Sequence, residues 1–584
     1  MKLPGSIPLF TTLATYDRAW LAADIVAGLT LWGLITPEAM AYAGVAGLPP
    51  QAGLYTLVAS LLVYALLGSS RQLSVGATSA TAALLASSLL VIGAISDDPA
   101  ATMANATALV LVVGIVFLVA AVLRLGFITQ FISEPVMAGF VTGLAVFVAV
   151  GQLNKLFGVE KPEGNTVERL IGIIRELPEA SIAASVVGLV ALALLFIVPR
   201  IDRRLPGGLI VLFGSIAVSS LLDLSGRYGV EIVGELPQGL PRLALPGPPT
   251  VGWAELLVPA IGIFFVAYSE ALGVAREFAE RHGYRVDADQ ELRAHAGVNL
   301  ATSVVGGMVA SGGMSGTAVN DGGGARTPVS LLVAWGAVVV TLLVLTPLFT
   351  TLPEAVLAAL IIHAVWHLIA ARKLHRFRSL STVEWTLGAI TFLGVILIDV
   401  LVGMVIGVTC AIAMEAYRSS RPHLATLGSV PGMPGAYVDL VRHPDARPSP
   451  GILVVRLDAP LYFANALTVE DALRRLLDAS PPPLRALVID AAVQDAIDVT
   501  GATAIATMAA ELERRRIALF VGDLHAPVRD FLREHGFLVI PADRDFATTG
   551  AAVEAAQEYA ATPVVNDDRQ PSPKPGDDVD DRDR

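Results

Sequence analysis

Long apolar runs alternate with short polar connections between residues 21 and 418, and this pattern stops in the rest of the chain. A helix that crosses a membrane needs about 20 mostly apolar residues. Runs of this kind, separated by charged residues, proline or glycine clusters, predict an α-helical polytopic membrane protein with fourteen spans. The spans are expected at roughly residues 21–43, 52–69, 77–95, 103–124, 130–154, 180–199, 207–223, 252–275, 290–307, 315–325, 329–348, 352–371, 383–399 and 400–417.

Basic residues near the ends of these runs predict the orientation of the chain, because cytoplasmic connections collect Lys and Arg. They precede the first span or follow even-numbered spans, at Lys2, Arg18, Arg71, Arg124, Arg200, Arg203, Arg204, Arg276, Arg281, Arg285, Arg326, Arg418, Arg421 and in the run ARKLHRFR. Odd-numbered connections are uncharged, acidic or of mixed sign. Both termini are therefore expected in the cytoplasm, with the spans in the inner (cell) membrane.

Two runs open with small polar residues where a full-length span would already lie in lipid. The third opens with RQLSVGATSATAA, and the tenth is SGGMSGTAVNDGGGARTP, residues 311–328. Such segments at matching places in two halves of a chain indicate a transporter site. Glu38 precedes Thr78 by 40 residues, and Glu270 precedes Ser315 by 45. The halves 21–223 and 252–418 are therefore predicted to form an inverted repeat of seven plus seven spans.

The third and tenth runs are predicted to be half-helices that meet head to head. The start of each helix carries a partial positive charge and free N–H groups, so the pair would form an anion site. The hydroxyls of Thr78, Ser79, Ser315 and Thr317 can add donors. The alternative is that these small residues only allow tight helix packing. A phosphate-binding P-loop is excluded, because GGGART lacks the GK[ST] ending.

Two glutamates, Glu38 and Glu270, lie inside predicted spans. A carboxylate there is costly and therefore indicates function. Because an ionised carboxylate beside a bound anion would repel it, either residue is a candidate proton carrier. The alternatives are a structural role for Glu38 at a helix kink made by Pro37, and a role for Glu270 as a polar anchor near the cytoplasm.

Composition agrees with a membrane protein: 54% of residues are hydrophobic and 16% are charged. The single cysteine, Cys410, excludes a disulfide framework and a multi-cysteine metal site. The nine histidines show no HExxH spacing. With no catalytic triad, nucleotide loop or metal cluster in the sequence, we expect neither an enzyme nor a cofactor, a metal site or a nucleic-acid partner.

The sequence changes after the last span. Short β-rich runs such as ILVVRL, ALVID and IALFVG alternate with helical patterns, which predicts a small α/β domain at residues 449–560. Residues 1–20 are expected to be a cytoplasmic segment without a signal peptide, and residues 419–448 a linker. The Asp- and Pro-rich residues 561–584 are expected to be a disordered acidic tail.

Several of these motifs resemble the SulP (sulfate permease) family of anion transporters, solute carrier family 26 in animals. DIVAGLTLWGLITPEAMAYAGVAGLPPQAGLYT resembles its first helix, SEPVMAGFVTGLA its fifth and SEALGVAREFAERHGYRVDADQEL its eighth with the following loop. GGMSGTAVNDGGGARTP resembles the tenth. The resemblance implies a uracil-permease-like transport domain of fourteen spans, in which a core domain moves as an elevator against a gate domain.

The family motifs also imply the residues that line the anion site between the third and tenth helices. These are Leu34, Glu38, Tyr42, Gly76, Ala77, Thr78, Ser79, Glu270, Ser315, Gly316 and Thr317. Two positions differ from many members: Glu38 stands where they have Gln, and Gly316 where they have Arg. The loss of a fixed positive charge and the gain of a titratable group fit a symporter better than a chloride exchanger or a motor.

The soluble domain resembles the STAS domain of sulfate transporters and anti-sigma-factor antagonists. IDVTGA places Thr500 at a helix start, where soluble antagonists carry a phosphorylatable residue. The alternative is that Thr500 is a helix N-cap. We expect this domain to serve assembly and regulation within a homodimer.

The sequence therefore predicts a secondary active transporter that couples the movement of a small anion to protons. The candidate substrates are sulfate, bicarbonate and a dicarboxylate such as fumarate. Sodium-coupled bicarbonate transport, anion exchange and an anion channel stay open as alternatives. A membrane-anchored STAS signalling scaffold is a hypothesis of another class, but a mere anchor needs neither half-helices nor intramembrane carboxylates.

Overall fold

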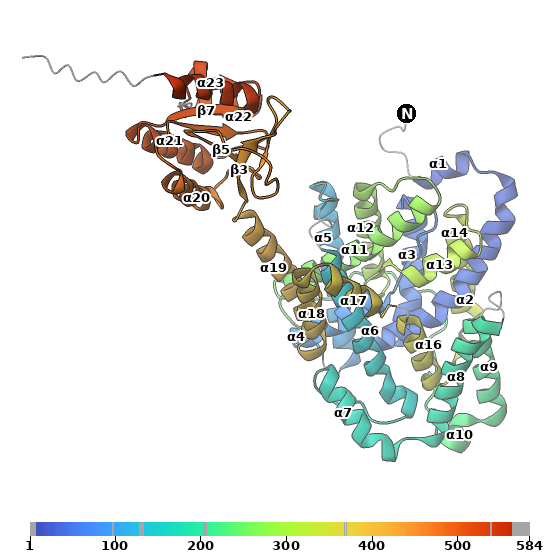
Figure 1. Ribbon diagram of the computed structural model, residues 1–584. Helices are drawn as coiled ribbons and strands as arrows, with labels where there is room; N and C mark the ends of the chain where they lie inside the picture. Colours follow the sequence, from blue (N-terminus) through green and yellow to red (C-terminus); the bar gives the residue numbers. More distant parts are fainter. Residues whose placement is uncertain are drawn as a thin grey trace, which may run out of the picture. The chain divides into compact units, whose positions relative to one another are not determined.

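The computed structural model describes residues 8–95, 98–127, 133–201, 207–366, 368–369, 371–537 and 540–562. The chain forms two compact units, Met1–Ile412 and Ala413–Arg584, and Figure 1 labels most of their helices and some of their strands. The predicted acidic tail lies outside the described residues, apart from its first two positions.

The first unit is helical, and each predicted span overlaps a helix among the described residues. The helices are α2 (Leu21–Val45), α3 (Pro50–Leu67), α4 (Ser79–Val91), α5 (Pro99–Val122), α6 (Glu134–Phe157), α8 (Ile182–Ile201), α9 (Gly207–Leu222), α11 (Leu257–Arg281), α12 (Ala288–Val304), α13 (Met314–Gly322), α14 (Val329–Val340) continued by the π-helical turn η4 (Thr341–Leu345) and α15 (Thr346–Phe349), α16 (Glu354–Trp366), α18 (Thr382–Leu397) and α19 (Val400–Ser419).

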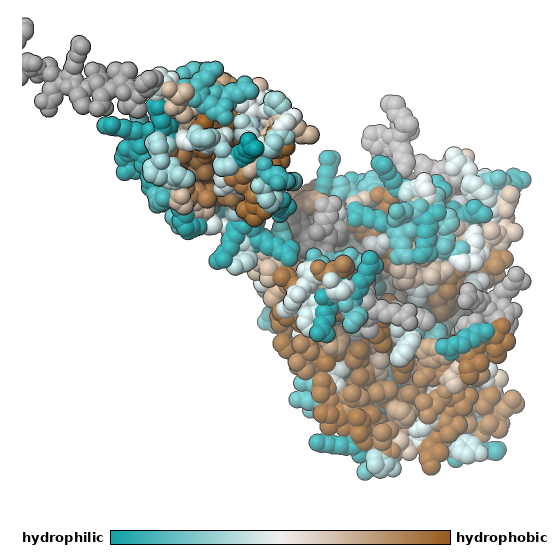
Figure 2. Space-filling model, viewed as in Figure 1, coloured by the Kyte–Doolittle hydropathy of each residue, from teal (hydrophilic) through white to brown (hydrophobic). Residues whose placement is uncertain are grey.

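Among the described residues, seven helical stretches are long and apolar enough to cross a membrane, and five shorter helices are also apolar. Figure 2 shows apolar residues over much of the visible surface of this unit, with hydrophilic residues gathered toward its two ends. Such a surface suits a bilayer, which is apolar in its centre and polar at both faces. The helical membrane fold is therefore confirmed, while the count of fourteen crossings stays a prediction.

Further helices connect the spans: α1 (Pro8–Ala14), η1 (Arg18–Trp20), α7 (Thr166–Glu176), η3 (Leu177–Glu179), α10 (Leu224–Tyr228) and α17 (Ala371–Leu380). These helices are short or polar, so the pattern of apolar runs does not predict them. Helix α7, for example, begins at a capping box in which Asn165 and Glu168 bond each other's backbone N–H groups.

The helices of this unit form two groups. The core group contains α2, α3, α4, α5, α11, α12, α13 and α14, and the gate group contains α6, α8, α9, α16, α18 and α19. The most extensive packing is within groups, as between α5 and α12, or between α6 and α18. The pairs also match across the two halves of the chain: α5 packs on α12 as α14 packs on α3, and α6 packs on α18 as α16 packs on α8. In each comparison the two halves of the chain have exchanged the equivalent helices of the pair, as two structural repeats would produce.

A short two-stranded sheet joins the two halves at the centre of the core group. Strands β1 (Val75–Gly76) and β2 (Ser311–Gly312) are antiparallel, with Val75 opposite Gly312 and Gly76 opposite Ser311. Each strand leads directly into a half-helix, β1 into α4 and β2 into α13. The sheet therefore brings the starts of these two helices together.

The second unit contains one six-stranded sheet in the order β4-β3-β5-β6-β7-β8. Its strands are β3 (Leu424–Ser429), β4 (Tyr437–Asp439), β5 (Ile452–Leu457), β6 (Ala486–Asp490), β7 (Ala518–Gly522) and β8 (Asp545–Phe546). Strands β5 to β8 are parallel, and β3 pairs antiparallel with both β4 and β5. Its helices are α20 (Ala466–Ala479), α21 (Val499–Arg514), α22 (Ala526–Glu534), α23 (Thr549–Ala561) and the short turn η5 (Ala542–Arg544).

Alternation along the strands covers both faces of this sheet. Leu453 and Val455 face the helices α20 to α22, whereas Val454 packs with residues of α23 on the other face. Residues 419–448 are not a linker, contrary to the prediction. They contain β3 and β4, whose sequences LATLGS and YVD form no continuous apolar run that would have predicted a strand.

Candidate functional site

Helix α4 begins two residues after the predicted start of the third span and α13 one residue before that of the tenth, but their first turns differ. In α4, Thr78 and Thr81 form a capping box, in which Thr78 Oγ1 accepts from Thr81 N at 3.2 Å and Thr81 Oγ1 accepts from Thr78 N at 3.1 Å. In α13 the N-cap is Gly313, which has no side chain to accept such a bond. The backbone donors at the start of α13 are therefore more available to a ligand.

A polar cavity of about 50 Å³ lies between these helix starts. A volume of this size has room for a few water molecules or a small anion. Both half-helix starts with the segments before them, together with α2, α3, α11 and the region of α16, supply its lining. The lining residues are Ile35, Glu38, Tyr42, Leu57, Ser74, Gly76, Ala77, Thr78, Ser79, Glu270, Gly313, Met314, Ser315, Gly316, Ala364 and Leu368. Most of the predicted site residues therefore surround one space.

The two glutamates are paired crosswise between the halves of the chain. Glu38, on α2, accepts a long hydrogen bond from Ser315 Oγ at 3.4 Å, and Glu270, on α11, accepts one from Thr78 Oγ1 at 3.5 Å. Glu38 is only 8% exposed, and Glu270 is half-buried. Each carboxylate thus contacts the hydroxyl at the start of the half-helix from the other half. Such long bonds exchange readily for contacts with a ligand.

Leu34 and Thr317 are not among the residues that line the cavity. Leu34 points toward α9, where a Cβ on Gly208 would lie 3.9 Å from Leu34 Cδ1, and the neighbouring Ile35 takes its expected place. Thr317 is fully buried, and its Oγ1 donates to Gly313 O at 2.6 Å and accepts from Ser74 N at 3.1 Å. Its hydroxyl is occupied by backbone, so it ties the two segments together rather than facing an anion.

Ser74 belongs to this brace, and the sequence analysis did not single it out. Gly313 N donates to Ser74 O at 3.1 Å, next to the bond from Ser74 N to Thr317. Ser74 lies within the polar opening of the third predicted span, which is the signal that could have identified it. Ala364 and Leu368 carry no such signal, because they are apolar residues of a distant span that tertiary packing brings to the cavity.

A buried cluster fixes the turn that precedes β1. Glu291 of α12 accepts from Tyr64 O–H at 2.9 Å, from Ser69 N at 2.8 Å and from Ser70 N at 3.2 Å. Glu291 is fully buried, and these donors satisfy its carboxylate oxygens. The cluster therefore holds the turn, and with it the path of the chain into α4.

Gly316 has a packing role that the comparison with the family motif did not reveal. A Cβ at this position would lie 2.9 Å from Ser74 Oγ and 3.4 Å from Ile35 Cγ2. A side chain here would therefore crowd the side chain of Ser74, the residue whose backbone forms the brace between the half-helices. Glycine at this position therefore has two effects: it leaves the site without a side-chain cation, and it leaves room for the side chain of Ser74.

We expect Gly316→Ala to weaken anion binding without adding charge, because overpacking here costs about 1–3 kcal/mol. Gly316→Arg adds the same crowding together with a cation. Affinity measured by substrate competition in proteoliposomes separates the two effects. Tighter binding in Gly316→Arg than in Gly316→Ala indicates that a cation at this mouth attracts the substrate. Equal affinities in both variants and in the unmodified protein would contradict the assignment of this mouth.

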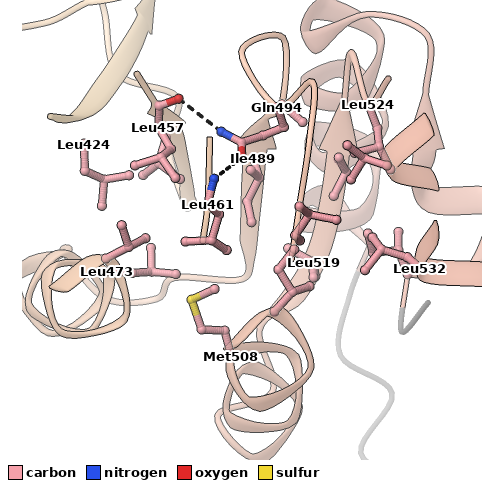
Figure 3. Close-up of a pocket in the computed structure, with 18 residues that line it drawn as sticks. Leu424, Leu457, Leu461, Leu473, Ile489, Gln494, Met508, Leu519, Leu524 and Leu532 are labelled. Atoms are coloured by element: carbon pink, nitrogen blue, oxygen red, sulfur yellow. Dashed lines mark hydrogen bonds between the residues drawn. The ribbon is translucent and has the colours of Figure 1, made fainter. Parts of the chain in front are cut away.

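A second cavity, of about 70 Å³, lies inside the STAS unit between the sheet and helices α20 to α22. Figure 3 shows Leu461, Leu473 and Met508 pointing into it. Its polar residue Gln494 is bonded to the backbone of Ala459 at 2.7 Å and of Leu461 at 2.9 Å. An apolar space of this kind does not compensate the desolvation of an anion, so it is not a second substrate site.

Thr500 is exposed in the first turn of α21. The N-cap of this helix is Asp498, whose Oδ1 accepts from Gly501 N at 2.7 Å. The alternative role of Thr500 as the N-cap is therefore wrong. In the part of the chain that the structure describes, no three His, Cys, Asp or Glu residues gather into a possible metal site.

Comparisons with known proteins agree with this architecture. The profile of the sulfate permease family matches residues 21–391. The chain belongs to this family. The STAS domain profile matches residues 443–553.

Relatives in the family match most of the length of the chain. A probable sulfate transporter of Mycobacterium tuberculosis is 34% identical over 559 residues, covering 95% of this chain and 99% of the relative. Human solute carrier family 26 member 6 is 31% identical over 495 residues, covering 80% of this chain and 64% of the relative. The solved structure of the murine Solute Carrier 26 family member A9 anion transporter has the same fold, with a TM-score of 0.88 at 24% identity over 95% of each chain.

The protein is therefore a multi-pass membrane protein and an anion transporter of the sulfate permease family with a C-terminal STAS domain. The family consists of transporters rather than enzymes.

Proposed function

We propose that this protein is a secondary active transporter that binds a small anion between the starts of α4 and α13 and couples its movement to protons through Glu38 and Glu270. The observation that carries the proposal is the crosswise pairing of each glutamate with the hydroxyl of the opposite half-helix. It places two ionisable groups and two sets of helix N-terminal donors around one cavity.

Charge compensation explains how the site would couple the two solutes. An ionised carboxylate next to the anion repels it, whereas a protonated one can donate a hydrogen bond to it. The empty site would then favour ionised glutamates bonded to Ser315 and Thr78, and the loaded site would favour protonated ones. Anion and proton would therefore bind together and leave together, as in a symporter.

An elevator movement is supported by the way the cavity is built. Core-group residues supply nearly all of its lining, while Ala364 and Leu368 close it from the region of α16 in the gate group. Because packing is most extensive within each group, the core group can slide as one body along the gate group. Such sliding would move the anion site from one face of the membrane to the other.

Sulfate is the first substrate to test, because relatives from Mycobacterium tuberculosis and Arabidopsis thaliana are named as sulfate transporters. Bicarbonate and dicarboxylates such as fumarate remain candidates, since helix N-termini bind anions by charge rather than by shape. We also propose an inner-membrane location, cytoplasmic termini and a homodimer.

The deciding experiment is uptake of labelled sulfate, bicarbonate and fumarate into proteoliposomes under an imposed proton or sodium gradient. We expect accumulation under the inward proton gradient and none under sodium alone. Accumulation driven only by sodium would replace the proton with sodium as the coupling ion. Flux that no gradient can drive above equilibrium would refute a symporter and indicate an exchanger or a channel.

A further inference from the structure

An exposed apolar patch lies on the STAS unit, formed by Phe463, Leu467 and Val499. These side chains are 71%, 75% and 62% exposed. Phe463 and Leu467 belong to the segment between β5 and α20 and to the first turn of α20, and Val499 begins α21. Three large apolar side chains displayed together on a soluble domain indicate a surface that contacts another apolar phase.

The patch is held rigidly. Phe463 N donates to Asp498 Oδ2 at 2.9 Å, which joins the Phe463 segment to the start of α21. Leu461, two residues before Phe463, is buried in the interior of the domain. Phe463 therefore faces outward while the backbone on both sides of it is fixed, so its exposure is a stable feature of the domain.

Hydrogen bonds connect the patch to the end of the last membrane helix. Tyr462 O–H and Ser419 Oγ lie 2.5 Å apart, and Asn465 Nδ2 donates to Ser419 O at 3.4 Å. Ser419 is the last residue of α19. The sheet agrees with this placement, since Leu457 at the end of β5 pairs with Leu424 at the start of β3, just after α19.

The end of α19 has the features of a membrane interface. Helix α19 has 20 residues, which corresponds to about 30 Å, the thickness of the hydrocarbon layer. Its last turn carries the exposed Tyr417 and Arg418, and Arg421 lies over the Tyr417 ring at 4.6 Å. Aromatic and basic side chains of this kind are typical of the headgroup level on the cytoplasmic side.

We propose that the Phe463 patch inserts into the interfacial layer of the same membrane and makes the STAS domain a peripheral membrane-binding domain. Phe463, Leu467 and Val499 would enter the boundary between headgroups and acyl chains, while Arg418 and Arg421 bind anionic headgroups. A lipid surface is favoured as the partner because Tyr462 and Asn465, which flank Phe463 in the chain, are bonded to the end of the helix that carries Arg418. The inference depends on the membrane topology and goes beyond the anion chemistry of the transport site.

Spin labels can test the proposal in the full-length protein, since Cys410 is the single native cysteine and Cys410→Ser removes it. Labels are attached at Phe463→Cys and Leu467→Cys in liposomes that contain anionic lipid. Met433→Cys is the matched control, because Met433 is 63% exposed and lies at the far end of β3 from α19. We expect the first two labels to collide with oxygen at least twofold more, relative to a water-soluble nickel chelate, than the control label does.

Equal access of the chelate to all three labels would overturn the proposal. Protection of positions 463 and 467 from both collision reagents would also overturn it, because it indicates docking on protein, such as a second copy of the chain.

A second variant keeps the fold intact and changes the charge beside the patch. Thr500 is exposed next to Val499, and an acidic residue in the first turn of α21 is favourable to the helix. We expect Thr500→Asp to restore access of the nickel chelate to the label at position 467, because the added charge faces an anionic surface. Thr500→Val should leave the lipid-exposed state unchanged. Identical collision rates in both variants would contradict insertion at this surface.

Discussion

We expect Glu38→Gln to abolish proton-driven accumulation of the anion while preserving anion exchange. Glutamine has the shape of glutamate and can accept the hydrogen bond from Ser315 Oγ, which Glu38 Oε2 accepts at 3.4 Å. It cannot carry a proton. If one proton is coupled to each anion, an inward gradient of one pH unit drives about tenfold more accumulation of the anion, since one unit corresponds to 1.36 kcal/mol. The measurement is labelled uptake into proteoliposomes with and without this gradient.

Glu270→Gln tests the second carboxylate in the same assay. Loss of coupling in one variant alone identifies the proton carrier, and loss in both indicates that the two sites act together. Glu277→Gln is the matched control, because Glu277 lies on the same helix but is exposed and paired with Arg281. Full gradient-driven uptake by Glu38→Gln and by Glu270→Gln would refute the proposed coupling. Loss of exchange as well would assign Glu38 to the geometry of the site.

A reversible cross-link between the core and gate groups is expected to stop transport completely. Ser87 of the half-helix α4 forms a short hydrogen bond to Asp399 Oδ1, in the connection between α18 and α19. An elevator cannot move without separating these two residues. In a Cys410→Ser background, Hg²⁺ bridging of Ser87→Cys and Asp399→Cys should abolish uptake, and excess thiol should restore it. The uptake rate of each preparation before Hg²⁺ is added is the reference for that preparation.

The control for this experiment joins the gate-group helix α9 to the connection that leads into the gate-group helix α16. Ser220 on α9 and Thr351 before α16 are exposed, with their Oγ atoms 2.9 Å apart. Bridging Ser220→Cys to Thr351→Cys should leave uptake unchanged, because these residues stay together in an elevator movement. Transport that continues at the full rate with a complete bridge between positions 87 and 399 would exclude sliding at this contact. Equal inhibition by both bridges would show that the reagent acts elsewhere.

Much of the helical unit could be predicted from local sequence. Every predicted span overlaps a helix in the described residues, because apolar runs of sufficient length have few alternatives in a membrane, where backbone groups must be bonded within the segment. The half-helices were predictable for the converse reason. Polar residues such as Thr78 and Ser315 interrupt apolar runs, and this interruption marks backbone that lines a cavity.

The central strands of the STAS unit could be predicted from the sequence, but the boundary at which the unit begins could not. Its runs ILVVRL, ALVID and IALFVG form β5, β6 and β7, which are central strands with continuous apolar character. Strands β3 and β4 lie in the stretch predicted as a linker, because neither contains a continuous apolar run and each gains its stability from a neighbour that it pairs with. The sequence does not contain that neighbour's position.

The sequence by itself determined the class of protein, the two polar interruptions and the two intramembrane carboxylates, since each depends on the solvation of residues close together in the chain. Only the tertiary structure decided which groups meet. It pairs Glu38 with Ser315 across 277 residues, adds Ala364 and Leu368 to the cavity, and turns Leu34 away from it. These contacts depend on helix packing and on the β1–β2 pairing, which bring together residues whose local sequences carry no information about each other.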